Sequence, residues 1–108
     1  MLFLCERVNY GVNIVSIKIN NLHDLSLIVR KVRKNQSLDQ STLGLLSGNG
    51  ITFISNFENG KETVEIGRVF KVLEMLGIDI YLDLPPSLSQ KELVEIQDYV
   101  KNLADDSK

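Results

Sequence analysis

The sequence of 108 residues predicts a mostly α-helical protein of one domain, with an added β-strand and a C-terminal helix. In several segments apolar residues recur at i, i+3, i+4 and i+7, the spacing of an amphipathic helix, and turns with glycine separate the shortest segments. A later segment alternates apolar and polar residues, as a strand does. The composition, 44% hydrophobic and 24% charged, is that of an ordinary globular domain with a modest core.

Composition and charge argue against several classes of protein. No apolar run approaches the roughly 20 residues that cross a bilayer, and the acid Glu6 comes too early for a signal peptide. The one cysteine, Cys5, cannot form an internal disulfide, which fits a reducing cytoplasm. The net charge of −2 combines a basic run at 30–34 with an acidic end at 79–108. We therefore expect a cytoplasmic protein without membrane contact.

The first 18 residues are expected to form an extension, for which a strand or hairpin is predicted. Val15, Ile17 and Ile19 alternate with polar residues, and the segment Asn9-Tyr10-Gly11 is a candidate turn. The alternative is an irregular, partly apolar extension. The main domain is expected over residues 19–77.

The first helix is predicted to begin after Asn21, whose short polar side chain suits an N-cap, and to stop near Asn35-Gln36. Asp24 is favourable near the positive end of this helix. The predicted apolar stripe is Leu25, Ile28, Val29 and Val32. The basic residues on the other faces are Arg30, Lys31, Arg33 and Lys34.

Two short helices follow, from Gln40 to about residue 46 with Asp39 as N-cap, and from 51 to 58. The turn 47–50, Ser-Gly-Asn-Gly, separates them, and Asn59-Gly60 ends the second. The side chains expected to point inward are Leu43, Leu46, Ile54 and Phe57.

A fourth helix is predicted after residues 61–63 and ends at Gly77. Its expected buried stripe is Ile66, Val69, Phe70, Leu73 and Leu76. A strand is then predicted over 78–84, before Pro85-Pro86. Because a lone strand cannot satisfy its own backbone, it needs a partner, either the first nineteen residues or the same strand of a second chain.

The last helix, within 87–104, is predicted from the pattern Ser89-x-x-Glu92, which matches a capping box. Its apolar stripe is Leu93, Ile96, Val100 and Leu103.

Two short helices joined by a turn of about four residues are typical of helix-turn-helix DNA binding. The turn sets the second helix at a steep angle to the first, so that its outer face can enter the major groove. The outward residues, candidate base contacts, are Ile51, Thr52, Ser55 and Asn56. Hydroxyls hydrogen-bond several bases, asparagine pairs with adenine, and Ile51 and the Thr52 methyl can touch a thymine methyl.

The stretches 29–36, 38–44 and 52–61 resemble the phage-repressor-like (Cro/C1, XRE) helix-turn-helix family, which implies a five-helix-type bundle. Residues 54–59, Ile-Ser-Asn-Phe-Glu-Asn, followed by 69–80, are most similar to the HipB antitoxins. The resemblance covers about residues 19–84. It implies a DNA-binding repressor that acts as a homodimer.

The resemblance also implies roles for particular residues. Gln40, which opens the first short helix, is implied to hold a phosphate through its side chain and its backbone amide. The loop of Asn59, Gly60 and Lys61 is implied to contact other phosphates through its backbone amides and its lysine side chain. Arg33 and Glu58 match an internal salt bridge. The strand matches a segment that pairs across the two-fold axis of the dimer: Ile78, Ile80, Leu82 and Leu84. Beside a recognition helix, Arg30 and Lys34 are further candidate phosphate contacts, or else a solvated helix face.

Three positions depart from the pattern of the family. Asn49 stands where a buried Val or Ile is usual, and Gly50 where a Ser, Thr or Lys starts the recognition helix. Gly44 replaces an alanine, which suits close helix packing but lowers helix propensity by about 1 kcal/mol.

The implied function is that of an autoregulating antitoxin, which represses an operator in double-stranded DNA and binds a HipA-like serine/threonine kinase toxin, complete or split. A stand-alone phage-like repressor and a toxin-binding module with little DNA binding are the alternatives. No enzyme is expected, and neither a metal nor a cofactor. The single histidine, His23, is predicted to be a surface residue, and neither metal-ligand spacing nor a phosphate-binding glycine loop occurs.

Overall fold

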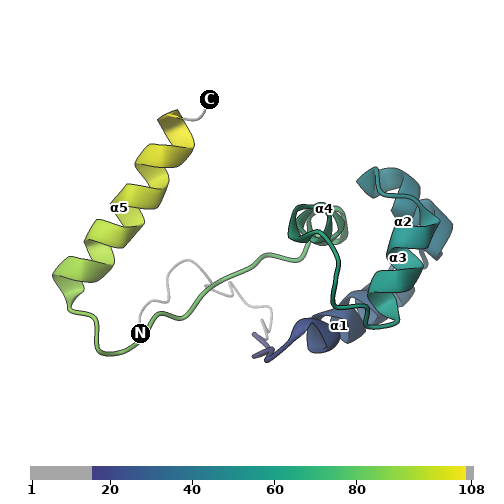
Figure 1. Ribbon diagram of the computed structural model, residues 1–108, viewed down its shortest axis with the longest axis horizontal. Helices are drawn as coiled ribbons and strands as arrows, with labels where there is room; N and C mark the ends of the chain where they lie inside the picture. The colour runs from purple at the N-terminus through teal and green to yellow at the C-terminus, as the bar shows by residue number, and fades with distance from the viewer. Residues whose placement is uncertain (1–15, 107–108) are drawn as a thin grey trace, which may run out of the picture.

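The computed structural model describes residues 16–106, which contain five helices (Figure 1). They are α1 (Leu22–Asn35), α2 (Gln40–Ser47), α3 (Ile51–Glu58), α4 (Ile66–Leu76) and α5 (Gln90–Asp106). Helices α1–α4 form a bundle, whereas α5 stands apart at the end of a long connection (Figure 1). The predicted mostly helical fold is confirmed. Within these residues no helix is long and apolar enough to span a membrane.

Three boundaries of the bundle helices lie at predicted capping residues. The Asn21 side chain accepts a hydrogen bond from the Asp24 amide at 2.8 Å, and the Asp39 side chain accepts one from the Thr42 amide at 2.7 Å. Gly77 ends α4 in the left-handed conformation, with a φ of 79°. Local side-chain chemistry therefore sets these boundaries.

The core of the bundle receives side chains from all four helices. The buried hydrophobic residues are Val29, Leu43, Ile54, Phe57, Val69, Val72, Leu73 and Leu76. Burial of one such side chain contributes about 1.5–3 kcal/mol. In addition, the Gln36 side chain donates a hydrogen bond to the Leu76 carbonyl at 2.8 Å, which joins the end of α1 to the end of α4. These contacts hold α3 in a fixed position.

Three side chains predicted to point inward are exposed instead: Leu46, Ile66 and Phe70, the last of them 53% accessible. Helix α4 buries Val69, Leu73 and Leu76, as predicted, together with Val72, which is not in the predicted stripe. This helix has more apolar residues than one face can hold, and the positions of α1 and α2 decide which row is covered. The predicted inward orientation of these three side chains is wrong.

The turn between α2 and α3 brings two backbones unusually close. The amides of Asn49 and Gly50 both donate to the Gly44 carbonyl, at 2.9 and 3.1 Å. A Cβ atom on Gly44 would lie 2.5 Å from the Gly50 carbonyl carbon. Gly50 itself has φ 86° and ψ 161°, a conformation that is essentially restricted to glycine. The glycines at 44 and 50 are therefore required by this turn, in line with the close packing that the sequence indicated at Gly44.

Residues 77–89 connect α4 to α5 without regular secondary structure. The strand predicted over 78–84 is not present, because no strand of the described residues lies beside it to pair with. Ile78 packs partly against the core, but Ile80, Leu82 and Leu84 are exposed, Leu82 by 80%. The predicted N-terminal strand or hairpin lies mostly outside the described residues, and 16–20 have no regular structure.

Helix α5 begins with the predicted capping box. The Ser89 amide donates to a Glu92 carboxylate oxygen at 2.8 Å, and the Glu92 amide donates to the Ser89 hydroxyl at 3.1 Å. Its apolar stripe is largely exposed, because α5 extends away from the bundle (Figure 1). The exposed members of the stripe are Ile96, Val100 and Leu103, and Leu93 is half-buried. The fold of α5 is local, without support from the core.

Candidate nucleic-acid interface

Helix α3 lies at the surface of the bundle, anchored by Ile54 and Phe57, which are fully buried. Its remaining sides carry the four side chains predicted to contact bases. Ile51 and Thr52 are exposed, whereas Ser55 and Asn56 are half-buried. The helix thus presents an aliphatic group, two hydroxyls and one amide outside the core. These are groups that can read the edges of base pairs in the major groove.

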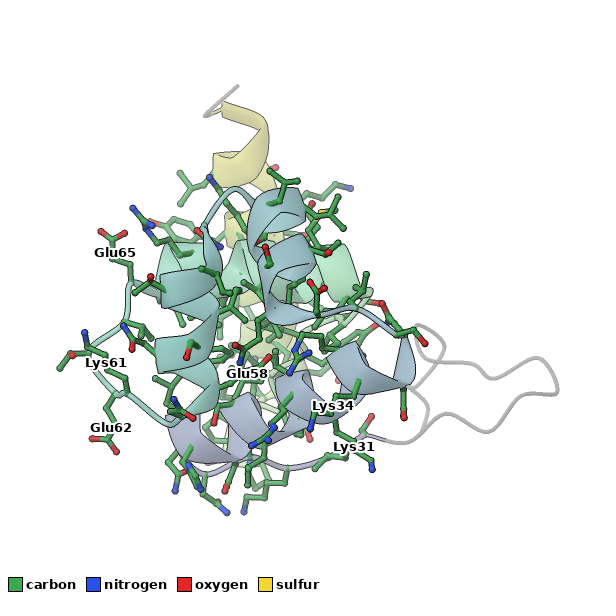
Figure 2. All side chains as sticks on the ribbon, turned by 90° about the vertical axis from the view of Figure 1, so that its right-hand side faces the viewer. Lys31, Lys34, Glu58, Lys61, Glu62 and Glu65 are labelled. Atoms are coloured by element: carbon green, nitrogen blue, oxygen red, sulfur yellow. The ribbon has the colours of Figure 1, made fainter. Side chains whose placement is uncertain are left out.

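A buried ion pair joins α3 to α1. Arg33 donates through Nε and Nη2 to the two carboxylate oxygens of Glu58, at 2.6 and 2.8 Å, and the side chains are only 7% and 1% exposed. The Arg33 Nη1 donates to the Leu38 carbonyl at 2.8 Å. Figure 2 shows Glu58 in the interior of the molecule, in contrast to the outward Lys31 and Lys34. The salt bridge implied by the resemblance is thus present, and its two-pronged geometry fixes the orientation of α3.

The carboxylate of Glu58 stays ionised despite its burial. Burial alone raises its pKa, but the hydrogen bonds from Arg33 and Gln40 and the nearby positive charges outweigh this effect and hold the pKa below the ordinary 4.5. Because the pKa is lowered in the folded state, the ion pair stabilises the fold at pH values above the unfolded pKa. That contribution is lost as the pH falls through the folded pKa.

Gln40, predicted to hold a phosphate, lies at the first position of α2. Its side-chain amide donates to Glu58 at 3.0 Å, so it is tied to the buried ion pair. An amide nitrogen carries two hydrogens, and the second remains for another acceptor. The backbone N–H at this position is also one that an α-helix leaves without an internal partner. Gln40 therefore connects the ion pair to the surface.

The loop after α3 uses its backbone amides in hydrogen bonds within the protein. The amides of Asn59, Gly60 and Lys61 donate to the carbonyls of residues 55, 57 and 56, each at 3.0 Å. They close the end of the helix, so these amides are already used. Amide contacts with phosphate, which the resemblance implies, would have to share these N–H groups, and they stay a prediction. The side chains of Asn59 and Lys61, both exposed, are the groups of this loop that can reach DNA.

Positive side chains lie on two sides of the bundle. Lys31 and Lys34 extend outward from α1, and Lys61 extends outward from the loop on the other side of Glu58 (Figure 2). Arg30 and Lys34, the candidate phosphate contacts of α1, are both exposed. Cations on two flanks suit a duplex, whose two phosphate strands border the groove.

A hollow of about 220 Å³ lies beside α3, and sequence reasoning did not predict it. Its lining residues are Phe53, Asn56, Lys61, Thr63, Val64, Glu65 and Arg68. The Arg68 guanidinium is 5.9 Å from the centre of the Phe53 ring, and its Nε donates to Glu65 at 2.7 Å. The i, i+3 spacing of Glu65 and Arg68 indicates the ion pair in the sequence. The proximity to Phe53 of α3 arises from the tertiary arrangement of the helices and has no sequence signal.

Helix α3 starts without a side-chain cap, because Gly50 has no side chain to supply one. Asn49, where the family has an apolar residue, donates to the Ser47 hydroxyl at 3.2 Å and to the Arg68 carbonyl at 3.1 Å. It therefore connects the turn to α4 by hydrogen bonds. The two departures are consistent with each other, since both belong to the same tight turn.

The single histidine lies against the loop after α3. A Cβ atom on Gly60 would be 2.9 Å from His23 Nδ1, an atom of an exposed side chain that can move aside, so the φ of 90° is what favours glycine there. His23 is exposed, as predicted. Residues 16–106 contain no group of three His, Cys, Asp or Glu side chains placed to hold a metal ion.

Comparison with known proteins gives concordant results. Residues 29–82 match the family described as Helix-turn-helix (HTH_3), a match that ends before α5. The chain is 41% identical over 68 residues to the uncharacterized HTH-type transcriptional regulator y4mF of Sinorhizobium fredii (strain NBRC 101917 / NGR234), covering 63% of this chain and 90% of that protein. Solved structures of a HipA-HipB-O2-O3 complex and of a HipB-O4 20mer complex each contain a similar chain. In both cases the TM-score is 0.60, the identity is 29%, and 64% of this chain and 97% of the other are covered.

Proposed function

Since the chain belongs to the Helix-turn-helix family of the Cro/C1/XRE type, we propose that it is a sequence-specific repressor that reads DNA with α3. The observation that carries this proposal is the placement of α3. The Arg33–Glu58 pair and the buried Ile54 and Phe57 hold it rigidly, and its outer side chains are polar or methyl-bearing. A fixed helix at the surface is what base reading requires, since contacts must form in one register.

The proposed base contacts are Ile51, Thr52, Ser55 and Asn56. The proposed phosphate contacts are Gln40, Asn59, Lys61, Arg30 and Lys34, and Gly60 is proposed to support them. For Gly60 the contribution is its backbone conformation, which positions Lys61, because its own amide is engaged. Phosphate contacts set the orientation of the protein on the duplex, and base contacts select the sequence.

Homodimerisation is a further part of the proposal. One helix of eight residues contacts too few bases for a specific site, so two copies are needed. The segment 78–84 has exposed Ile80, Leu82 and Leu84 next to the bundle. Pairing with its two-fold copy would cover these apolar side chains and fix the distance between the two recognition helices.

As the partner in the cell we propose a HipA-like kinase toxin, complete or split. In this proposal the chain is the antitoxin that regulates its own gene, in the cytoplasm of a bacterium. The support is that one of the similar solved structures is a HipA-HipB-O2-O3 complex. This chain is similar to a chain of that complex over 97% of that chain's length.

A second candidate is an interaction module that binds a toxin and little DNA. It is favoured by the exposed apolar residues of α5 and of segment 78–84, which lie at the end of the family match or beyond it. The stand-alone repressor differs from both in needing no toxin partner.

A gel shift with DNA from upstream of the chain's own gene, at several salt concentrations, separates these functions. A repressor forms a discrete complex that persists against excess random DNA. Binding that random DNA competes away, or no binding, favours the interaction module. An affinity capture with the neighbouring gene product then distinguishes the antitoxin from the stand-alone repressor.

A further inference from the structure

We propose that the hollow beside α3 is an additional phosphate site of the DNA interface, in which Arg68 binds a backbone phosphate and Glu65 competes for the same guanidinium. This inference rests on the proposed DNA binding and adds to it a residue pair that adjusts the affinity. Three features of the structure support it.

The hollow is continuous with the proposed interface. Asn56, a proposed base contact, and Lys61, a proposed phosphate contact, are both among its lining residues. A duplex bound along the outer face of α3 would bring a phosphate strand past these two side chains. The volume of about 220 Å³ has room for several water-sized groups, enough for a phosphate oxygen to enter.

Arg68 is held beside the hollow with donors to spare. The Phe53 ring positions its guanidinium at 5.9 Å, and only Nε is used in a hydrogen bond, to Glu65. An arginine carries five N–H donors, so its two terminal nitrogens remain for an anion. Their planar fork matches the oxygens of a phosphate.

The bond of Arg68 to Glu65 is one that a phosphate can replace. The two side chains are 48% and 76% exposed, and ion pairs so open to water and salt are weak. At the same time, the carboxylate is only 2.7 Å from the Arg68 Nε and repels an incoming phosphate. Glu65 therefore lowers the affinity of the site for DNA without occupying the groove.

A double-mutant cycle tests this proposal. We would measure binding of the full chain, Arg68→Gln, Glu65→Gln and the double variant to the upstream fragment and to a random duplex, by fluorescence anisotropy at several salt concentrations. Arg68→Gln is expected to weaken binding to both DNAs by a similar factor and to reduce the salt slope by about one. Glu65→Gln is expected to tighten binding by about two- to fivefold, and this gain is expected to vanish in the double variant.

Lys71→Gln is the matched control, because Lys71 is an exposed cation of α4 that does not line the hollow. A loss with Arg68→Gln no larger than with Lys71→Gln would overturn the proposal, since net charge alone would then explain it. A gain from Glu65→Gln that persists in the double variant would also overturn it. Thermal melts check that Arg68→Gln folds. If this variant does not fold, Glu65→Gln alone decides, and a DNA affinity no higher than that of the unchanged chain would overturn the proposal. Failure of the full chain to bind its upstream DNA would instead contradict the proposed function.

Discussion

The bundle of α1–α4 and the segment 77–106 have similar apolar patterns but differ in what covers them. The bundle buries eight hydrophobic side chains and one ion pair. In the second region Ile80, Leu82, Ile96 and Val100 are all at least 41% exposed. An amphipathic pattern therefore tells which face of a segment is to be covered, and the structure tells whether this chain covers it.

The difference divides the roles of the two regions. The bundle can hold α3 in place by itself, because its core and its ion pair are complete. The second region has an apolar face that the described chain leaves open, and exposed apolar surface of this kind is typical of interaction sites. We interpret the bundle as the DNA-reading unit and the second region as the contact with other chains.

The largest expected effect comes from breaking the buried ion pair. Arg33→Ala should lower the free energy of unfolding by about 3–5 kcal/mol, because Glu58 is left as an unpaired buried charge. Urea denaturation measures the loss. The control is Arg68→Ala, which removes an exposed partner and should cost no more than about 1 kcal/mol. Equal effects of the two variants would mean that the pair does not lock α3 to α1.

The next effect tests the two regions directly with one kind of change. Leu73→Ala, in the core, should lower the free energy of unfolding by about 2–5 kcal/mol. Val100→Ala, on α5, should change the free energy of unfolding by less than about 0.5 kcal/mol, because Val100 is exposed and lies outside the bundle. Thermal melts at low protein concentration compare the two. A large loss with Val100→Ala would show that α5 belongs to the folding unit.

A smaller effect is expected at the tight turn. Gly44→Ala should destabilise the bundle by about 1–3 kcal/mol, because the added Cβ overlaps the backbone of Gly50 and Ile51. The matched control is Gly67→Ala in α4, where a Cβ meets no atom within 4 Å and the better helix propensity should stabilise slightly. Chemical denaturation of both variants decides between them, and a stabilising Gly44→Ala would mean that the turn is looser than described.

The smallest effect on the fold, with a large one on assembly, is expected from Ile80→Pro. The proline removes a backbone N–H from the proposed pairing strand, so a dimer should dissociate while the bundle keeps its helical circular dichroism. Size-exclusion chromatography with light scattering gives the mass. A variant that remains dimeric and still binds its upstream DNA would move the interface elsewhere, with α5 as the next candidate.

The helices could be predicted from the sequence because their ends depend on local chemistry. Asn21, Asp39 and Gly77 lie at the boundaries that their side chains or their backbone freedom predict. The burial of Val72 in place of Phe70 could not be predicted, since it depends on where α1 and α2 lie against α4. The prediction of a strand over 78–84 is wrong for a related reason. An alternating pattern does not form a strand without an adjacent strand to pair with, and the described residues supply none.

The candidate site divides in the same way. The outward side chains of α3 follow from the helical period once Ile54 and Phe57 are buried. The use of the loop amides to close α3, and the position of Arg68 over Phe53, depend on tertiary packing. Resemblance indicated the Arg33–Glu58 pair, and only the structure shows that Gln40 joins it.

The most direct test of the account is the response of Asn56→Ala to two kinds of DNA. Asn56 reads a base in the proposed complex, so its truncation should weaken binding to the specific upstream site by about 1–3 kcal/mol and leave binding to random DNA nearly unchanged. Fluorescence anisotropy at one salt concentration measures both affinities on the same protein. An equal loss on specific and random DNA would contradict the claim that the outer face of α3 lies in the major groove.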